Sequence, residues 1–382
     1  MVTAVRRGAA ARAVARRFSV ALSTVQFWVA RAGDAPLRGV DFSDRPPGCR
    51  RARNRTTART ERSILRLRRD LRQTSVLGEY GAAAIRRELR AAGAKSIPSV
   101  RTIARVLARN GCVDRRGRVR RPPPPRGWHL PDVAAGRAEL DSFDAIEGLK
   151  IQGGPVVEVL NGISLHGRLA DCWPAKLVTA KFVICSLESR WRASGLPDYA
   201  QFDNDSTFAG NPRFTGMGRV VRFCLSLGVT PVFSPPREHG LQNLVEGFNA
   251  LYQAKVWRRH KMASLANLIA RSDAYVLAHR DRTAPRRDAV ERRAFPPRWR
   301  LDFDAALRGR VIFIRRTDGR GRFVALKRTF EADPLWPHRL VRAEVNLDTD
   351  AIHVFRLRKK DPDDQPLLKT IPYRFPRTRF CD

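Results

Sequence analysis

The charge of this 382-residue chain is spread unevenly and divides the sequence into three parts. Residues 1–140 hold 32 Lys and Arg against 10 Asp and Glu, whereas residues 141–260 hold 13 against 11. Residues 261–382 are basic again, with 28 against 16. The basic arms suit a polyanion, of which duplex DNA is the commonest in a cell. The nearly neutral middle is where a site built from acidic residues is to be sought.

Length and composition exclude several classes of protein. The length suggests two or three domains, and the 43% hydrophobic content is enough to build real cores. No run of about 18 apolar residues exists, so the sequence predicts neither a membrane span nor a membrane partner. The six cysteines lie far apart, which argues against a disulfide scaffold and a cysteine zinc site and favours a reducing interior.

Residues 1–36 are predicted to form a helix-turn-helix unit. Apolar residues recur at helical spacing on both sides of a turn at residues 19–22, and Ser23 is the expected N-cap of the second helix. In that motif the second helix enters the major groove. The candidate base contacts are Thr24, Gln26, Phe27 and Arg31, and an ordinary helical hairpin is the alternative.

A basic linker is expected over residues 37–60, followed by a second helix-turn-helix unit, winged-helix-like, over residues 61–116. Ser99 is the expected N-cap of its last helix and Gly111 the stop. Arg101, Thr102 and Arg105 are its candidate DNA contacts. The Pro- and Arg-rich stretch 117–131 is interpreted as a stiff hinge and a domain boundary.

The middle of the chain predicts a mixed α/β layer over residues 132–295. Strand-like segments at 138–144, 155–164 and 166–173, with a turn near Asn161-Gly162, precede alternating helices and strands. The expected later elements are a helix over 175–193, a strand over 198–203, a helix over 217–227, a strand over 229–233 and a helix over 242–259.

The C-terminal part changes character again. Four short β-like runs between residues 308 and 358 are separated by Gly, Asp and Pro. Their spacing predicts a small β barrel, SH3-like, over residues 300–360, followed by a basic tail over 361–382.

Three acids in the neutral middle are candidates for catalysis and metal binding: Asp141, Asp203 and Glu246. Acids at strand ends and on a nearby helix can converge at one sheet edge, where clustered carboxylates need a cation. Mg²⁺ or Mn²⁺, as two ions, would fit such oxygen ligands and support phosphoryl transfer. Asp144 is the alternative first acid, and solvated surface carboxylates are the alternative interpretation of the whole set.

The order of these features resembles the DDE transposases of bacterial insertion sequences, which have a retroviral-integrase-like core. The specific motifs are Gln201-Phe202-Asp203-Asn204-Asp205 and the Pro235-Pro236 loop that leads to Asn243-Leu244-Val245-Glu246-Gly247-Phe248-Asn249. The resemblance implies an RNase H-like core whose Asp141, Asp203 and Glu246 bind two divalent ions. It also implies strand nicking, transfer of element ends into target DNA, a homo-multimer on double-stranded DNA and a cytoplasmic, nucleoid-associated protein.

The sequence departs from that family's pattern in two places. Asp205 stands where many members have glycine, and 43 residues separate Asp203 from Glu246, more than is usual. Residues 210–218 could be a surface insertion that accounts for the extra length. These departures motivate a second hypothesis, a DNA-binding protein with an inactive core. A third hypothesis is a basic RNA-binding protein that uses the C-terminal β barrel.

Overall fold

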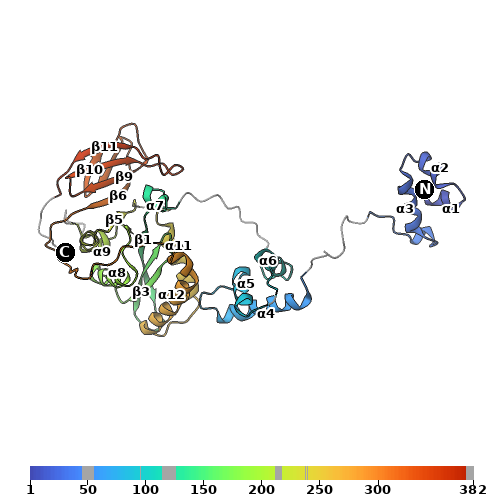
Figure 1. Ribbon diagram of the computed structural model, residues 1–382, viewed down its shortest axis with the longest axis horizontal. Helices are drawn as coiled ribbons and strands as arrows, with labels where there is room; N and C mark the ends of the chain where they lie inside the picture. The colour runs from blue at the N-terminus through green and yellow to red at the C-terminus, as the bar shows by residue number, and fades with distance from the viewer. Residues whose placement is uncertain are drawn as a thin grey trace. The chain divides into compact units, whose positions relative to one another are not determined.

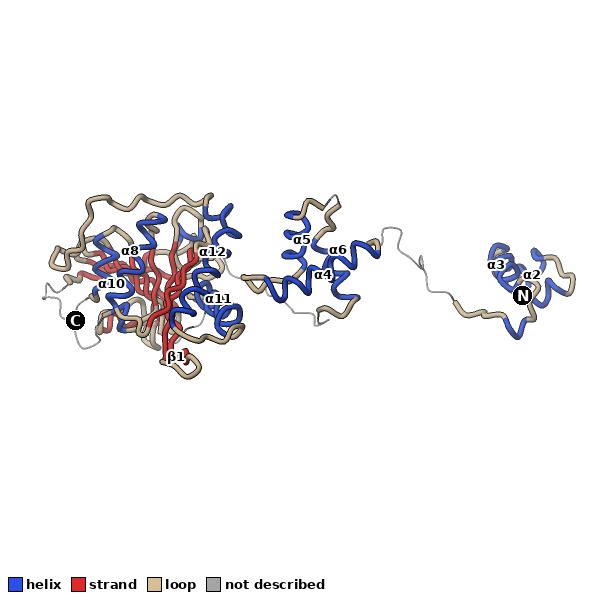
Figure 2. Tube along the Cα trace, turned by 90° about the horizontal axis from the view of Figure 1, so that it is seen from below, coloured by secondary structure: helices blue, strands red, loops and turns tan. Residues whose placement is uncertain are grey.

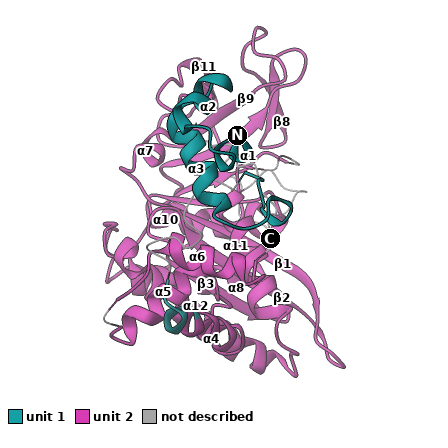
Figure 3. Cartoon of the chain, turned by 90° about the vertical axis from the view of Figure 1, so that its right-hand side faces the viewer, with its two compact units in different colours: residues 1–61 teal, residues 62–382 magenta. Residues whose placement is uncertain are grey.

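The computed structural model describes residues 1–44, 56–94, 96–113, 126–210, 217–236, 238 and 240–375. The chain divides into two compact units, Met1–Glu61 and Arg62–Asp382 (Figure 3). No helix within the described ranges is long and apolar enough to cross a membrane. Predictions that concern Cys49, His239, Cys381 and most of the 117–131 hinge, the 210–218 insertion and the end of the 361–382 tail lie outside the described residues.

The N-terminal unit contains short helices packed around Val14 and Val25. Ser19 turns the chain with a left-handed φ of 51°, in the predicted turn. The second helix begins one residue before Ser23, so Ser23 is not its N-cap, and no side chain caps that end. The elements are α1 (Val2–Arg6), α2 (Ala11–Arg17), α3 (Leu22–Ala32) and η1 (Leu37–Gly39).

The next helices, α4 (Ala58–Thr74), α5 (Ala82–Ala91) and α6 (Val100–Arg109), share a small apolar core. The predicted N-cap is confirmed, because the Ser99 side chain accepts a hydrogen bond from the Thr102 amide. α4 begins inside the segment expected to be linker. Residues 56–94 and 96–113 contain no strand, so the wing of a winged helix is absent from that part.

The middle of the chain forms a mixed sheet, as predicted. Within the described residues this sheet has nine strands in the order β11-β10-β9-β6-β5-β4-β1-β2-β3. β2 runs antiparallel to β1 and β3, whereas β4 pairs parallel with β1 and β5 pairs parallel with β4. The strands from the middle are β1 (Leu140–Lys150), β2 (Val156–Ser164), β3 (Ala170–Ala175), β4 (Tyr199–Phe202) and β5 (Thr230–Phe233).

The predicted turn at Asn161-Gly162 is wrong, since both residues lie inside β2. The chain turns later, where Arg168 adopts a left-handed φ of 57°. Gly162 is required by packing: a Cβ there would come within 2.6 Å of the Phe143 ring on the paired strand. A glycine can therefore mark close approach within a strand as well as a turn.

Helices cover both faces of the sheet (Figures 1 and 2). Residues from α8 and α10 pack in one apolar cluster, and residues from α11 and α12 pack in another with β1, β2 and β3. The helices are α7 (Pro131–Ala134), α8 (Ala180–Ser194), α9 (Ser206–Ala209), α10 (Arg219–Ser226), α11 (Asn243–Tyr252), the π-helical turn η2 (Gln253–Trp257) and α12 (Leu265–Arg287).

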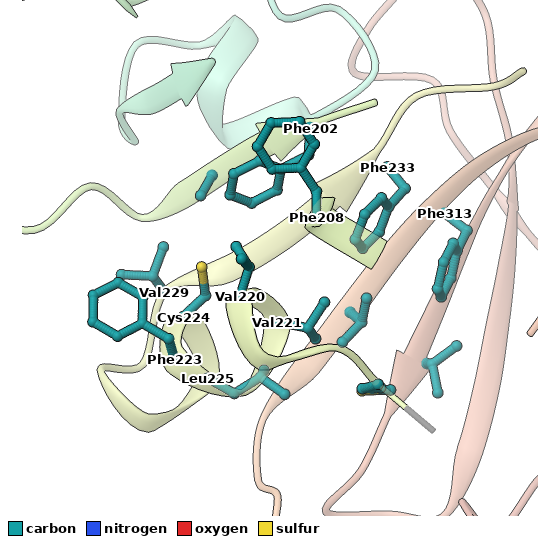
Figure 4. Packing of buried hydrophobic residues seen from close by; sticks show 14 of the residues in the cluster. Phe202, Phe208, Val220, Val221, Phe223, Cys224, Leu225, Val229, Phe233 and Phe313 are labelled. Atoms are coloured by element: carbon teal, nitrogen blue, oxygen red, sulfur yellow. The ribbon is translucent and has the colours of Figure 1, made fainter. Parts of the chain in front are cut away.

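The C-terminal strands extend the core sheet, and this corrects the expectation of a separate barrel over 300–360. β6 pairs parallel with β5 through Val232 and Phe233, and β9, β10 and β11 follow in antiparallel order. The rings of Phe233 and Phe313 stack across that junction, 5.3 Å apart (Figure 4). The strands are β6 (Arg310–Arg316), β7 (Arg322–Ala325), β8 (Arg328–Glu331), β9 (Leu340–Asn346), β10 (Ala351–Arg356) and β11 (Leu367–Pro372), and β7 and β8 form a separate pair.

Candidate active site

Asp144 and Asp203 lie side by side at the edge of two parallel strands. Ser142 on β1 pairs with Gln201 on β4. Two residues further along each segment, Asp144 therefore lies opposite Asp203, just beyond the end of β4. Neighbouring strands are about 4.8 Å apart, which brings the two carboxylates close together. Asp203 directly follows the last residue of β4, as the sequence predicted.

A chain of amides connects Asp144 to the helix that carries Glu246. Asn249 on α11 donates its Nδ2 to Asp144 Oδ2 at 2.7 Å. Asn249 Oδ1 accepts from Asn161 Nδ2 on β2, also at 2.7 Å. Glu246 lies one helical turn before Asn249, so it faces the same side of α11. The sequence did not predict that Asn249 would hold the first acid.

Asp144 and Asp203 lie among other acids, and their surroundings disfavour the ionised form. Burial, and then the charge of Asp203, raises the pKa of Asp144 to about 7, with Glu246 and Glu147 adding to the effect. Burial also raises the pKa of Asp203, although the Asp205 amide donates to its Oδ1 at 3.0 Å and opposes the shift. Glu246 itself is exposed to solvent.

The paired acids open on a small cavity of about 60 Å³ that Asp144, Glu147, Asp203 and Asp205 line. One water needs roughly 10–15 Å³, so the cavity has room for a cation with only part of its hydration shell. In the described part of the chain, no group of three or more His, Cys, Asp and Glu side chains is already close enough to hold a metal ion. Asp144 and Asp203 provide a pair of oxygen donors with surplus negative charge, and Glu246 lies nearby. Such a donor set suits a hard divalent cation.

Asp141 does not join this group, which corrects the preference for it as the first acid. Side chains alternate along a strand, so residues three apart point to opposite faces of the sheet. Asp141 faces α8, where it is fully buried and where Arg190 donates to its Oδ2 at 3.0 Å. Arg292 donates to both of its oxygens, at 3.0 and 2.9 Å. Because these guanidiniums outweigh the cost of burial, the pKa of Asp141 lies well below its usual range.

The ion pairs of Asp141 with Arg190 and Arg292 belong to a larger buried network. Ser164, opposite Asp141 on β2, donates its hydroxyl to Asp141 Oδ1 at 2.7 Å. Arg190 also pairs with Asp171 on β3, and Arg280 on α12 pairs with the other oxygen of Asp171. Arg190 is fully buried, and its carboxylate partners raise its pKa. The network neutralises Asp141 and leaves no oxygen for a cation.

The loop after β4 is held by its own contacts. Asn204 donates to the Ser234 carbonyl at 2.5 Å and accepts from Arg315 at 2.8 Å. Asp205, which stands in place of glycine, caps α9 by accepting from the Thr207 amide at 2.8 Å. Both contacts fix the direction of the chain beyond Asp203. Asp205 is thus a turn and cap residue.

The candidate DNA-contacting residues differ in how exposed their side chains are and in the contacts that they already make. Gln26 is exposed on α3 and Thr24 is half-buried, whereas Arg31 stacks on Trp28 and donates to the Ser43 carbonyl at 2.9 Å. On α6, Arg101 and Arg105 are exposed and Thr102 is half-buried beside its cap.

No protein-family model matches the chain, and no curated protein matches it. Among solved structures, the chain is similar to a chain of the simian T-cell lymphotropic virus intasome in complex with a PP2A regulatory subunit. The identity is 13%, with a TM-score of 0.33, over 77% of this chain and 93% of that one. The chain is also similar to the HTLV-2 integrase catalytic core in complex with magnesium. The sequence identity is 15% and the TM-score 0.26, over 36% of this chain and 81% of that one. For the catalytic core domain of BIV integrase the sequence identity is 19% and the TM-score 0.25, over 37% of this chain and 81% of that one. These likenesses are remote.

The role of Asp141 is tested by the stability of an Asp141→Asn variant. Removing this charge leaves Arg190 and Arg292 buried and undercompensated, so the free energy of unfolding should fall by about 3–5 kcal/mol. Urea denaturation of the full chain measures it. Glu188→Gln is the control, because the Glu188–Arg192 pair is partly exposed on α8 and should contribute no more than about 0.5 kcal/mol. Equal effects of the two variants would contradict the structural role of Asp141.

The raised pKa of Asp144 predicts an opposite effect for Asp144→Asn. An unfolded aspartate ionises near 3.8, whereas the folded Asp144 holds its proton to about 7. The folded state therefore loses stability as the pH rises from about 4 to above 7. In EDTA at pH 8, the melting temperature of the variant should be higher than that of the wild type. At pH 4 the two melting temperatures should differ little. A control variant, Asp288→Asn, removes an exposed carboxylate and should show no such dependence on pH. A lower melting temperature of Asp144→Asn at pH 8 would refute the interpretation.

Proposed function

We propose that this protein is a DDE-type DNA transposase that nicks DNA and transfers the ends of a mobile element into target DNA. The observation that carries the proposal is the pairing of Asp144 with Asp203, with Glu246 held nearby on α11. The order β3-β2-β1-β4-β5, with β2 antiparallel, supports the RNase H-like core that the sequence resemblance implied. The triad of the proposal is therefore Asp144, Asp203 and Glu246.

Asp144 and Asp203 would hold a divalent cation, Mg²⁺ or Mn²⁺, and Glu246 would complete a second position. Such ions, when bound, activate an attacking hydroxyl and stabilise the leaving oxygen in phosphoryl transfer. Asn249 orients Asp144 through its amide, and the contacts of Asn204 hold the loop that presents Asp203. Above a pH of about 7 Asp144 is ionised, so cation binding by this pair should strengthen as the pH rises through that value.

The basic arms would bind the DNA on which this site acts. Exposed arginines such as Arg101 and Arg105 on α6 suit phosphate contacts, and Gln26 on α3 suits a base edge. Thr24 and Thr102 remain proposed contacts at the starts of their helices, whereas the packing of Arg31 on Trp28 favours a structural role. Binding that depends on phosphates weakens steeply with salt. A multimer that holds two DNA ends is part of the same proposal.

A second candidate function is DNA binding by a core without catalytic activity. It is favoured by one observation, the lack of a ready three-ligand metal group in the described residues. Under this alternative the acids would still be paired, but divalent ions would not support cleavage. Duplex binding without nicking in either Mg²⁺ or Mn²⁺ would establish it.

The proposal is tested by a nicking and strand-transfer assay on duplexes taken from the DNA on either side of the gene. Asp144→Asn, Asp203→Asn and Glu246→Gln should each lower the metal-dependent rate at least about 100-fold, since each removes a ligand of the reacting centre. Asp288→Asn is the control, because it removes an exposed carboxylate that does not line the cavity of the acids, and activity should stay within about twofold. Undiminished joining by Asp144→Asn would refute the triad.

A further inference from the structure

A cavity of about 600 Å³ lies beside the acids, on another side of α11. Glu246 faces Asp144, whereas the next residue, Gly247, lines this cavity. Its floor is formed by strand residues such as Leu140 and Ile163, and its walls by apolar residues of α11, including Phe248. The volume is in the range typical of sites for small ligands and cofactors.

The cavity contains polar groups that have no partner in the described residues. His129 is 3% exposed, and neither of its ring nitrogens forms a hydrogen bond. His279 Nδ1 is also buried without a partner. Burial, followed by Arg342, lowers the pKa of His129 to about 4, so its ring is neutral and offers one donor and one acceptor. Buried polar groups are normally satisfied, so these nitrogens point to a polar ligand.

Positive charge gathers at the same cavity. Arg126, Arg168 and Arg286 line it, and none of the three forms an ion pair within the described residues. Burial and the charges of the other two arginines lower the pKa of Arg168, whose Nε has no hydrogen-bond partner. Of the charges that shift this pKa, only Glu139 opposes the arginines, so the three guanidiniums leave a net positive charge that suits an anion such as phosphate.

We infer that this cavity binds a nucleoside monophosphate unit, with its phosphate on Arg168 and Arg286 and its base against Phe248 and His129. A base combines an aromatic face with donors and acceptors along its edge, which matches an apolar wall that carries unsatisfied ring nitrogens. A fatty acid would satisfy the arginines but leave His129 unpaired. The unit can come from a free nucleotide or from a nucleotide of a DNA strand. The inference rests on the cavity and not on the proposed cleavage reaction.

The test is calorimetric titration of the full chain with dAMP in EDTA, where cleavage cannot occur. Saturable binding of one dAMP per chain is expected, at least tenfold tighter than deoxyadenosine or inorganic phosphate. Arg168→Gln and Arg286→Gln should each weaken it about tenfold or more, the loss of one charge-assisted hydrogen bond. Arg287→Gln is the matched control on α12, since Arg287 pairs with Asp288 and does not line the cavity, and it should change the affinity less than twofold.

A second variant separates the two sources of the nucleotide. A Cβ at Gly247 would meet no atom within 4 Å, so Gly247→Leu should fold while its side chain fills the cavity. If dAMP binds the wild type and not this variant, the site takes free nucleotides. If only a single-stranded oligonucleotide loses affinity in the variant, the site takes a nucleotide of a strand. Unchanged binding of both probes in Gly247→Leu and Arg168→Gln would overturn the inference. Both titrations are run in EDTA, without the divalent cation that the proposed cleavage requires, so failure of this inference and failure of the proposed reaction are distinguishable.

Discussion

The buried ion pairs around Asp141 are the interaction on which the rest of the core depends. They join β1 and β3 to α8, to α12 and to the chain that follows α12, through Arg190, Arg280 and Arg292, and Ser164 of β2 adds a hydrogen bond to Asp141. Each of these charges costs several kcal/mol to bury, and only the full set of partners offsets that cost. The network therefore fixes the face and the register of β1. By fixing one face, it determines which residues the other face presents.

That other face carries the opposite electrostatic arrangement. Asp144 is three residues from Asp141, yet its neighbours are Asp203, Glu246 and the amide of Asn249, without a cation among the interactions that shift its pKa. The same type of side chain is held ionised by arginines on one face and pushed toward protonation by acids on the other. A compensated carboxylate stabilises the fold, and an uncompensated pair is available to a ligand. This contrast assigns the two aspartates of β1 their separate roles.

The sequence was sufficient to predict the mixed sheet, most helices of the core and two of the three proposed acids. It favoured Asp141 as the first acid and kept Asp144 as the alternative. Strand alternation would have argued against that choice, because it sets Asp141 and Phe143 on one face and Asp144 on the other. The partners of Asp141 could not be foreseen: Arg190 and Arg292 lie 49 and 151 residues away along the chain. Likewise, the barrel was expected from local spacing alone, whereas the parallel pairing of β5 with β6 depends on long-range packing.

The proposed centre and the inferred nucleotide cavity share α11. Glu246 and Asn249 face the acids, and Gly247 faces the cavity, so one helix of ten residues separates two kinds of site. A glycine between them keeps the cavity open and brings no side chain of its own.

The central claim is that Asp144 and Asp203 form the cation site and Asp141 does not. The most direct measurement is anomalous scattering from crystals of the full chain soaked in Mn²⁺ at pH 8. The account predicts an anomalous peak at coordination distance, about 2.2 Å, from the carboxylates of both Asp144 and Asp203. A peak against Asp141, or bound Mn²⁺ with none at the Asp144–Asp203 pair, would contradict it.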